Sequence, residues 1–235
     1  MAMAERVIPE GAVPVLDHGF VRLDADMATD LAVVNGARVS FARHQTEMTE
    51  ADEGLIRFLM RERHASPFEH AVFRFHIRCP LFVAREWQRH RWSSFNEFSL
   101  RYAKATEDFY VPEPDDVRTQ VGKPGAYSFE PVEPEVADMA REELESVYEH
   151  AFAAYERMVE AGVARELARS ALPVGAYTEF YWTVNARALM NFVSLRNAEM
   201  AQREIRRYAE VVETFFADRM PVTHAAFVAA GRTAP

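Results

Sequence analysis

The residues best suited to chemistry lie between Arg85 and Arg101, in the sequence REWQRHRWSSFNEFSLR. Several arginines fall together there, where a helix is expected to end and a loop of serine, asparagine and glutamate begins. Guanidinium groups bind phosphate through paired hydrogen bonds, whereas the neutral side chains suit a base or a sugar. The segment therefore indicates a nucleotide site. A solvated helix end with ion pairs between adjacent turns is the plainer alternative.

A second polar cluster is HASPFEH, residues 64–70. Its two histidines and glutamate suggest metal ligands, but the order is not HExxH, and Pro67 interrupts the helix that such ligands need. We expect no metal site. A histidine that stacks on a flat ligand, or a structural histidine, is the better interpretation.

A third cluster lies in NARALMNFVSLR, which is expected to form one helix. Asparagines buried among its apolar residues would need hydrogen-bond partners, either from a cofactor or from neighbouring backbone. Its polar members are Asn185, Arg187, Asn191 and Arg196.

Other kinds of catalytic site find little support. The single cysteine, Cys79, rules out an internal disulfide, and its apolar context indicates a buried, inert thiol. Ser99 has no histidine base nearby and no GxSxG context, so a hydrolase is not indicated. Neither a GxGxxG nor a GxxxxGK[ST] motif is present.

The charge distribution points to a confined anion site. The net charge is 27 − 36 = −9, which argues against general affinity for nucleic acid or an anionic membrane. Residues 85–104 nevertheless hold five basic and two acidic side chains, and residues 165–207 hold seven and four. Surface ion pairs alone would also explain these arginines.

The overall composition indicates a globular protein. Of the 235 residues, 49% are hydrophobic and 12% aromatic, enough for a sizeable core. No apolar run approaches the roughly 18 residues of a membrane span. No secretory signal is visible either, so we expect a cytoplasmic protein.

The pattern along the chain predicts the elements that position these residues. A helix should begin after Thr49, a strand should cover 71–79, a helix 81–91, and a polar loop 93–99. Residues 111–134 are rich in proline and glycine and read as a long surface excursion. Helices are expected over 134–159, 163–172, 185–196 and 199–219, with a strand over 179–184. We therefore predict one α+β domain over residues 1–235, predominantly helical, with a small antiparallel or mixed sheet.

The arginine segment resembles a known family signature. Arg89-His90-Arg91 followed by Ser99 matches the RHRx7S motif of the flavin-dependent thymidylate synthases, in the longer form RHRxxSxNExSxR. The segments HASPFEH, ARELARSALP and WTVNARALMNF agree as well. The resemblance covers about residues 20–230.

The resemblance implies a fold and a reaction. Members of the family form homotetramers whose active sites are shared between subunits, with FAD at the junction. NADPH reduces the flavin, and 5,10-methylenetetrahydrofolate gives its methylene group to carbon 5 of dUMP. Flavin hydride completes the reduction to dTMP, so the cofactor carries the difficult chemistry. No enzyme cysteine is needed. We expect no nucleic-acid or membrane partner.

The resemblance also implies roles for individual residues. Arg196 would be catalytic, because a fixed cation facing the pyrimidine favours its N3-ionised form. Arg169 would reach dUMP from another subunit, and His64 would lie where folate or nicotinamide stacks. The expected dUMP contacts are Glu86, Arg89, Glu97, Ser99, Leu100, Arg101, Arg169 and Arg196. The expected FAD contacts are Ser66, Arg89, His90, Arg91, Glu97, Asn185, Arg187 and Asn191.

Three residues depart from the family pattern. Glu86 stands where glutamine is frequent, and its carboxylate would repel phosphate unless an arginine such as Arg85 or Arg89 pairs with it. Leu100 replaces a usual glycine, and Met200 a usual histidine. Two other functions stay open. One is a non-catalytic nucleotide- or RNA-binding module that uses the arginine-rich helix, and the other is an inactive structural oligomer.

Overall fold

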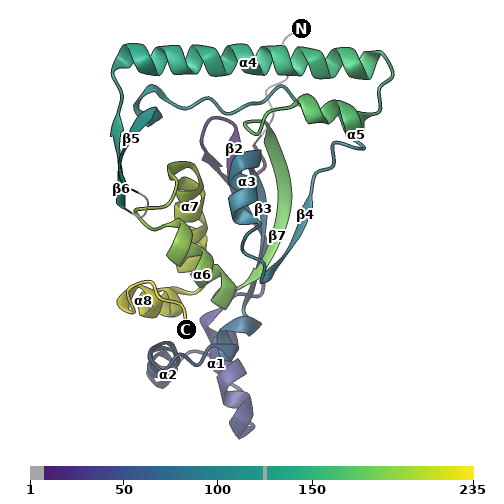
Figure 1. The fold of residues 1–235 in the computed structure, drawn as a ribbon. Coiled ribbons are helices and arrows are strands. Elements are labelled where there is room, and N and C mark those ends of the chain that lie inside the picture. The colour runs from purple at the N-terminus through teal and green to yellow at the C-terminus, as the bar shows by residue number, and fades with distance from the viewer. Residues whose placement is uncertain (1–7, 124–125) are drawn as a thin grey trace.

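A five-stranded antiparallel sheet forms the centre of the computed structural model, which describes residues 8–123 and 126–235 (Figure 1). The strands lie in the order β1 (Ala12–Val15), β2 (Gly19–Asp26), β3 (Val72–Pro80), β7 (Tyr177–Asn185) and β4 (Ser93–Glu97). About half of the described residues are helical. The predicted α+β fold with a small antiparallel sheet is confirmed.

The strand predicted from the alternating pattern over 71–79 is β3, which lies in the middle of the sheet. Phe73, Phe75 and Ile77 are fully buried on one face, whereas Arg74 on the other face is exposed. Arg78 departs from the pattern, since it is buried and pairs with Asp108 at 2.5 Å. A buried guanidinium needs such a partner.

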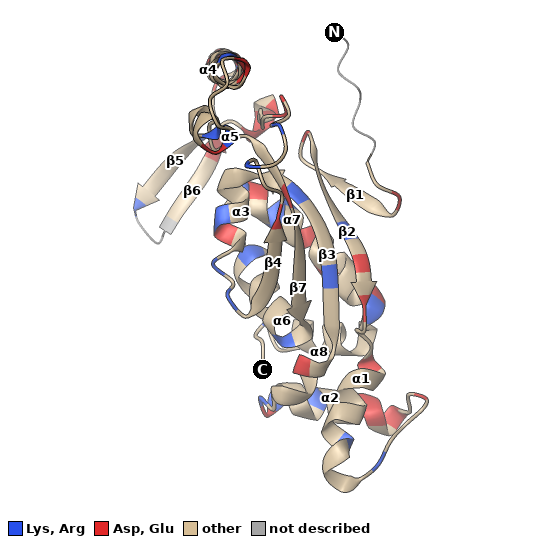
Figure 2. Ribbon diagram, turned by 90° about the vertical axis from the view of Figure 1, so that its right-hand side faces the viewer, with Lys and Arg blue, Asp and Glu red and all other residues tan. Residues whose placement is uncertain are grey.

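Helices α3 (Leu81–Trp87), α6 (Ala186–Arg196) and α7 (Arg203–Arg219) cover one face of the sheet (Figure 1). The ring of Trp87 stacks on Phe192 with centroids 4.7 Å apart, which fixes the ends of α3 and α6 against each other. No helix of the described residues covers the opposite face, which is turned to the viewer in Figure 2. Tyr181 is 39% exposed there.

Helices α1 (Asp30–Arg38), α2 (Glu50–Arg61) and α8 (Pro221–Ala229) lie together at one end of the molecule. The predicted start of α2 is confirmed. The Thr49 side chain accepts from the Asp52 backbone, and the Asp52 side chain accepts from the Thr49 backbone. This reciprocal cap satisfies two N–H groups that the helix cannot. Asp52 is fully buried and also pairs with Arg38.

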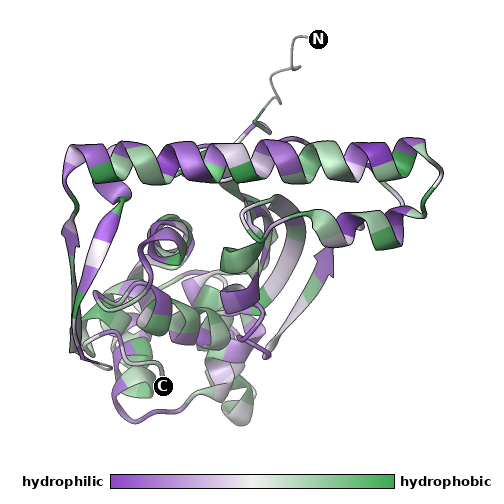
Figure 3. Ribbon diagram, turned by 45° about the horizontal axis from the view of Figure 1, so that its top comes forward, coloured by the Kyte–Doolittle hydropathy of each residue, from purple (hydrophilic) through white to green (hydrophobic). Residues whose placement is uncertain are grey.

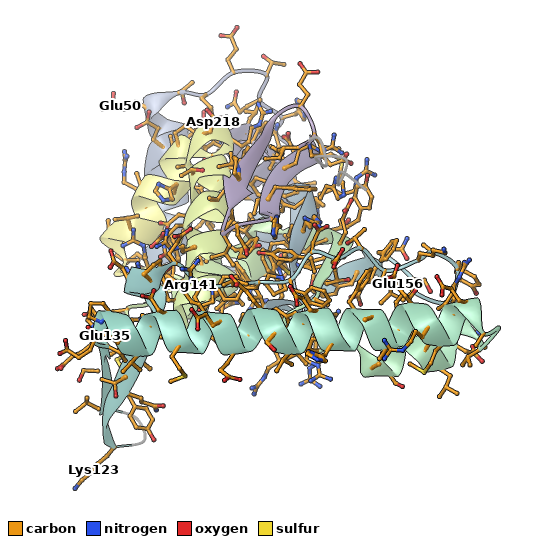
Figure 4. All side chains as sticks on the ribbon, turned by 90° about the horizontal axis from the view of Figure 1, so that it is seen from above. Glu50, Lys123, Glu135, Arg141, Glu156 and Asp218 are labelled. Atoms are coloured by element: carbon orange, nitrogen blue, oxygen red, sulfur yellow. The ribbon has the colours of Figure 1, made fainter. Side chains whose placement is uncertain are left out.

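Helix α4 (Pro134–Glu160) crosses the other end, followed by the short α5 (Arg165–Ala168). Green and purple residues alternate along α4 in Figure 3, as expected of the predicted amphipathic helix. Its Tyr148, Phe152 and Tyr155 form a second core with Phe109. Arg141 reaches from α4 toward the body and donates to the Pro112 carbonyl at 2.9 Å (Figure 4).

Four predicted boundaries are wrong. The helix expected over 163–172 is the short α5 followed by a 3-10 turn, Arg169–Ala171. The polar loop expected over 93–99 is largely strand β4, because the backbone of an edge strand can pair with β7 while its polar side chains stay in solvent. The helix expected over 81–91 ends at Trp87, since residues 88–92 must turn the chain into β4. Helix α7 begins at Arg203 rather than at Glu199, because residues 198–202 form the turn after α6.

The segment 111–134 is more ordered than a loop. It contains an antiparallel hairpin of β5 (Arg118–Lys123) and β6 (Ala126–Pro131), and its strand β5 is largely exposed. Lys123 lies at the far end of this hairpin, away from the body (Figure 4). No helix in residues 8–123 and 126–235 is long and apolar enough to cross a bilayer.

Candidate active site

The end of α3 and the end of α6 bring Glu86, His90 and Arg196 together. Arg196 is the last residue of α6, and its Nη1 donates to Glu86 Oε2 at 2.6 Å. Its Nη2 donates to the Glu86 carbonyl at 3.1 Å, and its Nε to His90 Nε2 at 3.0 Å. The carboxylate of Glu86 therefore pairs with Arg196 instead of with Arg85 or Arg89.

The electrostatics of this cluster follow from partial burial. Burial, with Arg196 and Arg89 nearby, lowers the pKa of His90 to about 4. The imidazole is therefore neutral near pH 7, and its Nε2 is free to accept from Arg196. Burial also raises the pKa of Glu86, with Arg196 opposing the shift and Glu204 adding to it.

A second cluster follows strand β4 and contains Ser99, Leu100, Arg101 and Arg169. Arg101 Nε donates to Glu166 Oε2 at 3.0 Å, and Arg169 Nε donates to the Glu166 carbonyl at 3.3 Å. The Arg101 backbone N–H donates to Ser99 Oγ at 3.4 Å, across a turn that contains Leu100. Two arginines predicted to hold dUMP are thus neighbours within one chain.

Glu97 lies between these clusters, at the end of β4. Its Oε1 accepts from Thr178 Oγ1 at 2.6 Å and its Oε2 from Gln88 Nε2 at 3.2 Å. Within residues 8–123 and 126–235, no hydrogen bond or ion pair joins the Glu86–Arg196 cluster to the Arg101–Arg169 cluster.

A third cluster surrounds the start of α6. Asn185 caps this helix by accepting from the Ala188 N–H at 2.9 Å. Arg187 donates to Glu69 Oε1 at 2.7 Å and to the Pro235 carbonyl at 3.2 Å. Ser66 begins the 3-10 helix Ser66–His70 that carries Glu69. The cap and the exposed position of Asn191 show that neither asparagine is buried without a partner.

The remaining predicted contacts face solvent. Arg89 and Arg91 are exposed, and within the described chain neither guanidinium has a hydrogen bond or an ion pair. His64 is exposed and meets the ring of Phe58 edge-on at 5.7 Å.

Cys79 is fully buried, and burial raises the pKa of its thiol well above the ordinary value. The predicted burial is confirmed, and a thiol that stays protonated is a poor nucleophile.

The structure adds polar partners that the sequence analysis missed. Glu166 joins Arg101 to Arg169, Glu69 holds Arg187, and Gln88 and Thr178 hold Glu97. Glu166 had a local signal, since it precedes Arg169 by one helical turn. The other contacts join residues that are far apart in the sequence, or residues on the two sides of a turn. The spacing of residues along the sequence therefore does not predict them.

Known proteins are similar to this chain in sequence and in fold over most of its length. The family model described as "Thymidylate synthase complementing protein" matches residues 22–222. A flavin-dependent thymidylate synthase of Thermosipho africanus is 44% identical over 91% of this chain and 92% of its own length. One from Streptomyces coelicolor is 45% identical over 92% of this chain and 93% of its own.

A solved structure with the same fold is the UMP/dUMP methylase PolB from Streptomyces cacaoi, bound with 5-Br dUMP. It is 43% identical, with a TM-score of 0.86, and the match covers 95% of this chain and 100% of that one. The same enzyme has also been solved with 5-Br UMP. The agreement over nearly the whole length, in sequence and in fold, means that this chain belongs to the family of flavin-dependent thymidylate synthases.

Proposed function

We propose that this protein converts dUMP to dTMP, taking the one-carbon group from 5,10-methylenetetrahydrofolate. The hydride for the reduction comes from bound FAD, which NADPH reduces. The observation that carries this proposal is Arg196, a cation fixed at the end of α6 by acceptors on α3 and its following turn. Relatives that are named as enzymes and match more than nine-tenths of this chain favour this activity over a non-catalytic binding module.

The residues expected to hold FAD suit such a ligand. A diphosphate needs guanidinium groups that are not already paired, and Arg89 and Arg91 are exposed without partners in the described chain. Arg187 is exposed as well, although it forms an ion pair with Glu69.

Arg196 would stabilise negative charge on the pyrimidine. Removal of the N3 proton spreads charge onto the neighbouring carbonyl oxygens, and a fixed cation favours that state more than a mobile one. A neutral His90 supports this role, because a protonated imidazole could not accept from Arg196 and would repel it.

Arg101 and Arg169 would bind the phosphate. Both side chains lie against Glu166 and are exposed, so an incoming dianion can replace the weaker surface contacts. Ser99 would donate from the same turn, in a binding role.

Self-association into a homotetramer with shared sites forms part of the proposal. The expected dUMP contacts include two clusters on one chain that no hydrogen bond or ion pair among the described residues joins directly. A site completed by a second copy would bring one cluster of each kind together. The uncovered face of the sheet is a suitable surface for that copy. We also propose a cytoplasmic location, where the nucleotide and folate substrates are made.

Methylation of UMP is a second candidate activity. PolB, which is described as a UMP/dUMP methylase, is about as similar to this chain as the thymidylate synthases are, at 44% and 43% identity in its two structures. Competition between equimolar UMP and dUMP would decide which nucleotide is preferred.

The test is product formation by the purified protein. With FAD, NADPH, 5,10-methylenetetrahydrofolate and dUMP together, chromatography should detect dTMP. Omission of any one component should abolish it. A protein that binds flavin but forms no methylated nucleotide would overturn the proposed activity.

A further inference from the structure

Glu86 supplies two of the three acceptors that hold Arg196. Its carboxylate accepts from Nη1 at 2.6 Å, and its backbone carbonyl accepts from Nη2 at 3.1 Å. The third acceptor is His90 Nε2, four residues further along the chain. The side chains of Arg196 and Glu86 are only 18% and 25% exposed, so water competes weakly for these contacts.

The remaining donors of Arg196 define what it can bind. A guanidinium group has five N–H bonds, and the contacts within the described chain use three of them. One N–H therefore remains on Nη1 and one on Nη2. These two donors belong to a cation, so they suit an N3-ionised pyrimidine, whose ring nitrogen and carbonyl oxygens carry the negative charge.

The charges around Glu86 favour an ion pair with Arg196 over a direct contact between Glu86 and the nucleotide. The groups that act on its carboxylate are Arg196 on α6, Arg89 in the turn after α3, and Glu204 on α7. Glu204 is also an acceptor for Tyr110 at 3.2 Å. A nucleotide monophosphate would add a second anion that repels Glu86, whereas Arg196 already satisfies it.

We propose that Glu86 is a positioning residue that acts through Arg196, orienting its two remaining N–H groups toward the pyrimidine. This proposal rests on the proposed function and replaces the expectation that Glu86 contacts dUMP directly. The negative charge of Glu86 also offsets part of the charge of Arg196. An unpaired arginine would be more cationic but free to rotate.

The first test compares Glu86→Ala with Glu86→Gln. The amide of glutamine keeps an oxygen that can accept from Nη1, so kcat for dTMP formation should stay within about tenfold of wild type. Alanine leaves Nη1 unpaired, and kcat should fall about 100-fold while the dUMP dissociation constant changes less than about fivefold. Glu53, paired with Arg57 on α2, supplies the matched control, and Glu53→Ala should leave both values unchanged.

The decisive test repeats the binding measurement in Arg196→Ala protein, using the dUMP-induced change in the flavin spectrum. If Glu86 acts only through Arg196, Glu86→Ala should not raise the dissociation constant by more than about twofold in that background. A clear further loss of affinity would make Glu86 a direct ligand and overturn the proposal. Should the double variant not fold, Glu86→Gln in the Arg196→Ala background carries the same comparison. Wild-type protein that binds flavin and dUMP but makes no dTMP would instead refute the proposed function, leaving the binding comparison valid.

Discussion

At the scale of single residues, the proposed reaction depends on how the side chain of Arg196 is held. Its three contacts come from Glu86 and His90, which lie about 110 positions away in the sequence. The Glu86 carboxylate attracts the guanidinium group by its negative charge. The His90 imidazole can accept from it because the ring is neutral.

Arg196→Ala should abolish dTMP formation, with kcat at least about 1000-fold lower, because the pyrimidine anion loses its fixed cation. The flavin should stay largely bound, since the expected FAD contacts are other residues. Product assays and the ratio of flavin to protein absorbance measure the two effects, with Arg57→Ala as a control on α2. Unchanged turnover would remove Arg196 from its assigned role.

Glu86→Gln should bind dUMP as tightly as wild type, or up to about tenfold more tightly, because a negative charge that repels the anionic nucleotide disappears while an acceptor for Arg196 remains. Titration of the flavin spectrum with dUMP gives the dissociation constant. A clear loss of affinity would show that the carboxylate itself is needed for binding.

His90 should make the protein less stable in mild acid. Its pKa is about 4 in the folded protein, against about 6.5 in an unfolded chain. The unfolded state therefore binds more protons between those values, so stability falls as the pH drops from about 6.5 toward 4.

Glu86, whose pKa is raised, contributes with the opposite sign, so the comparison must isolate His90. Melting temperatures of wild type and His90→Gln at pH 7.5 and 5.0 provide it. The wild type should lose more on acidification, and equal losses would contradict the assignment of a neutral imidazole.

At the scale of helices and strands, the sequence predicts those elements that a local residue pattern determines. Alternation defines β3, three-and-four spacing defines α4, and the Thr49–Asp52 pair marks the start of α2. Strand β4 could not be predicted from its sequence, because its polar residues are typical of a loop. Its backbone pairing with β7 makes it a strand.

The candidate site divides in the same way. The local motif RHRxxSxNExSxR identifies Arg89, Ser99 and Arg101, and the other segments of the family resemblance add Arg169 and Arg196. The ion pair between Glu86 and Arg196 depends on the packing of α3 against α6 through Trp87 and Phe192. No spacing in the sequence contains that information.

The capping box of α2 gives a test at this scale. Thr49→Ala removes the side-chain acceptor for the Asp52 N–H and should lower the free energy of unfolding by about 1 kcal/mol. Urea denaturation measures this difference. The exposed Thr46, three residues earlier, supplies the control, and Thr46→Ala should stay within about 0.5 kcal/mol of wild type.

At the scale of the whole molecule, the two groups of expected dUMP contacts predict that mixing inactive subunits restores activity. Arg196→Ala and Arg101→Ala remove residues from different clusters. If one site takes one cluster from each of two chains, some sites in a mixed oligomer keep both arginines.

Each variant should therefore be inactive alone, and a co-purified mixture should regain part of the wild-type rate. Sedimentation should show a tetramer for all three preparations. A mixture as inactive as its components would place each site within a single chain.

The measurement that tests the central claim most directly is the visible absorption spectrum of the purified, FAD-loaded protein during titration with dUMP. A nucleotide that binds beside the flavin changes the environment of its ring. We expect a saturable change in the flavin bands as dUMP is added. Protein that takes up no FAD, or a flavin spectrum that dUMP leaves unaltered, would contradict it.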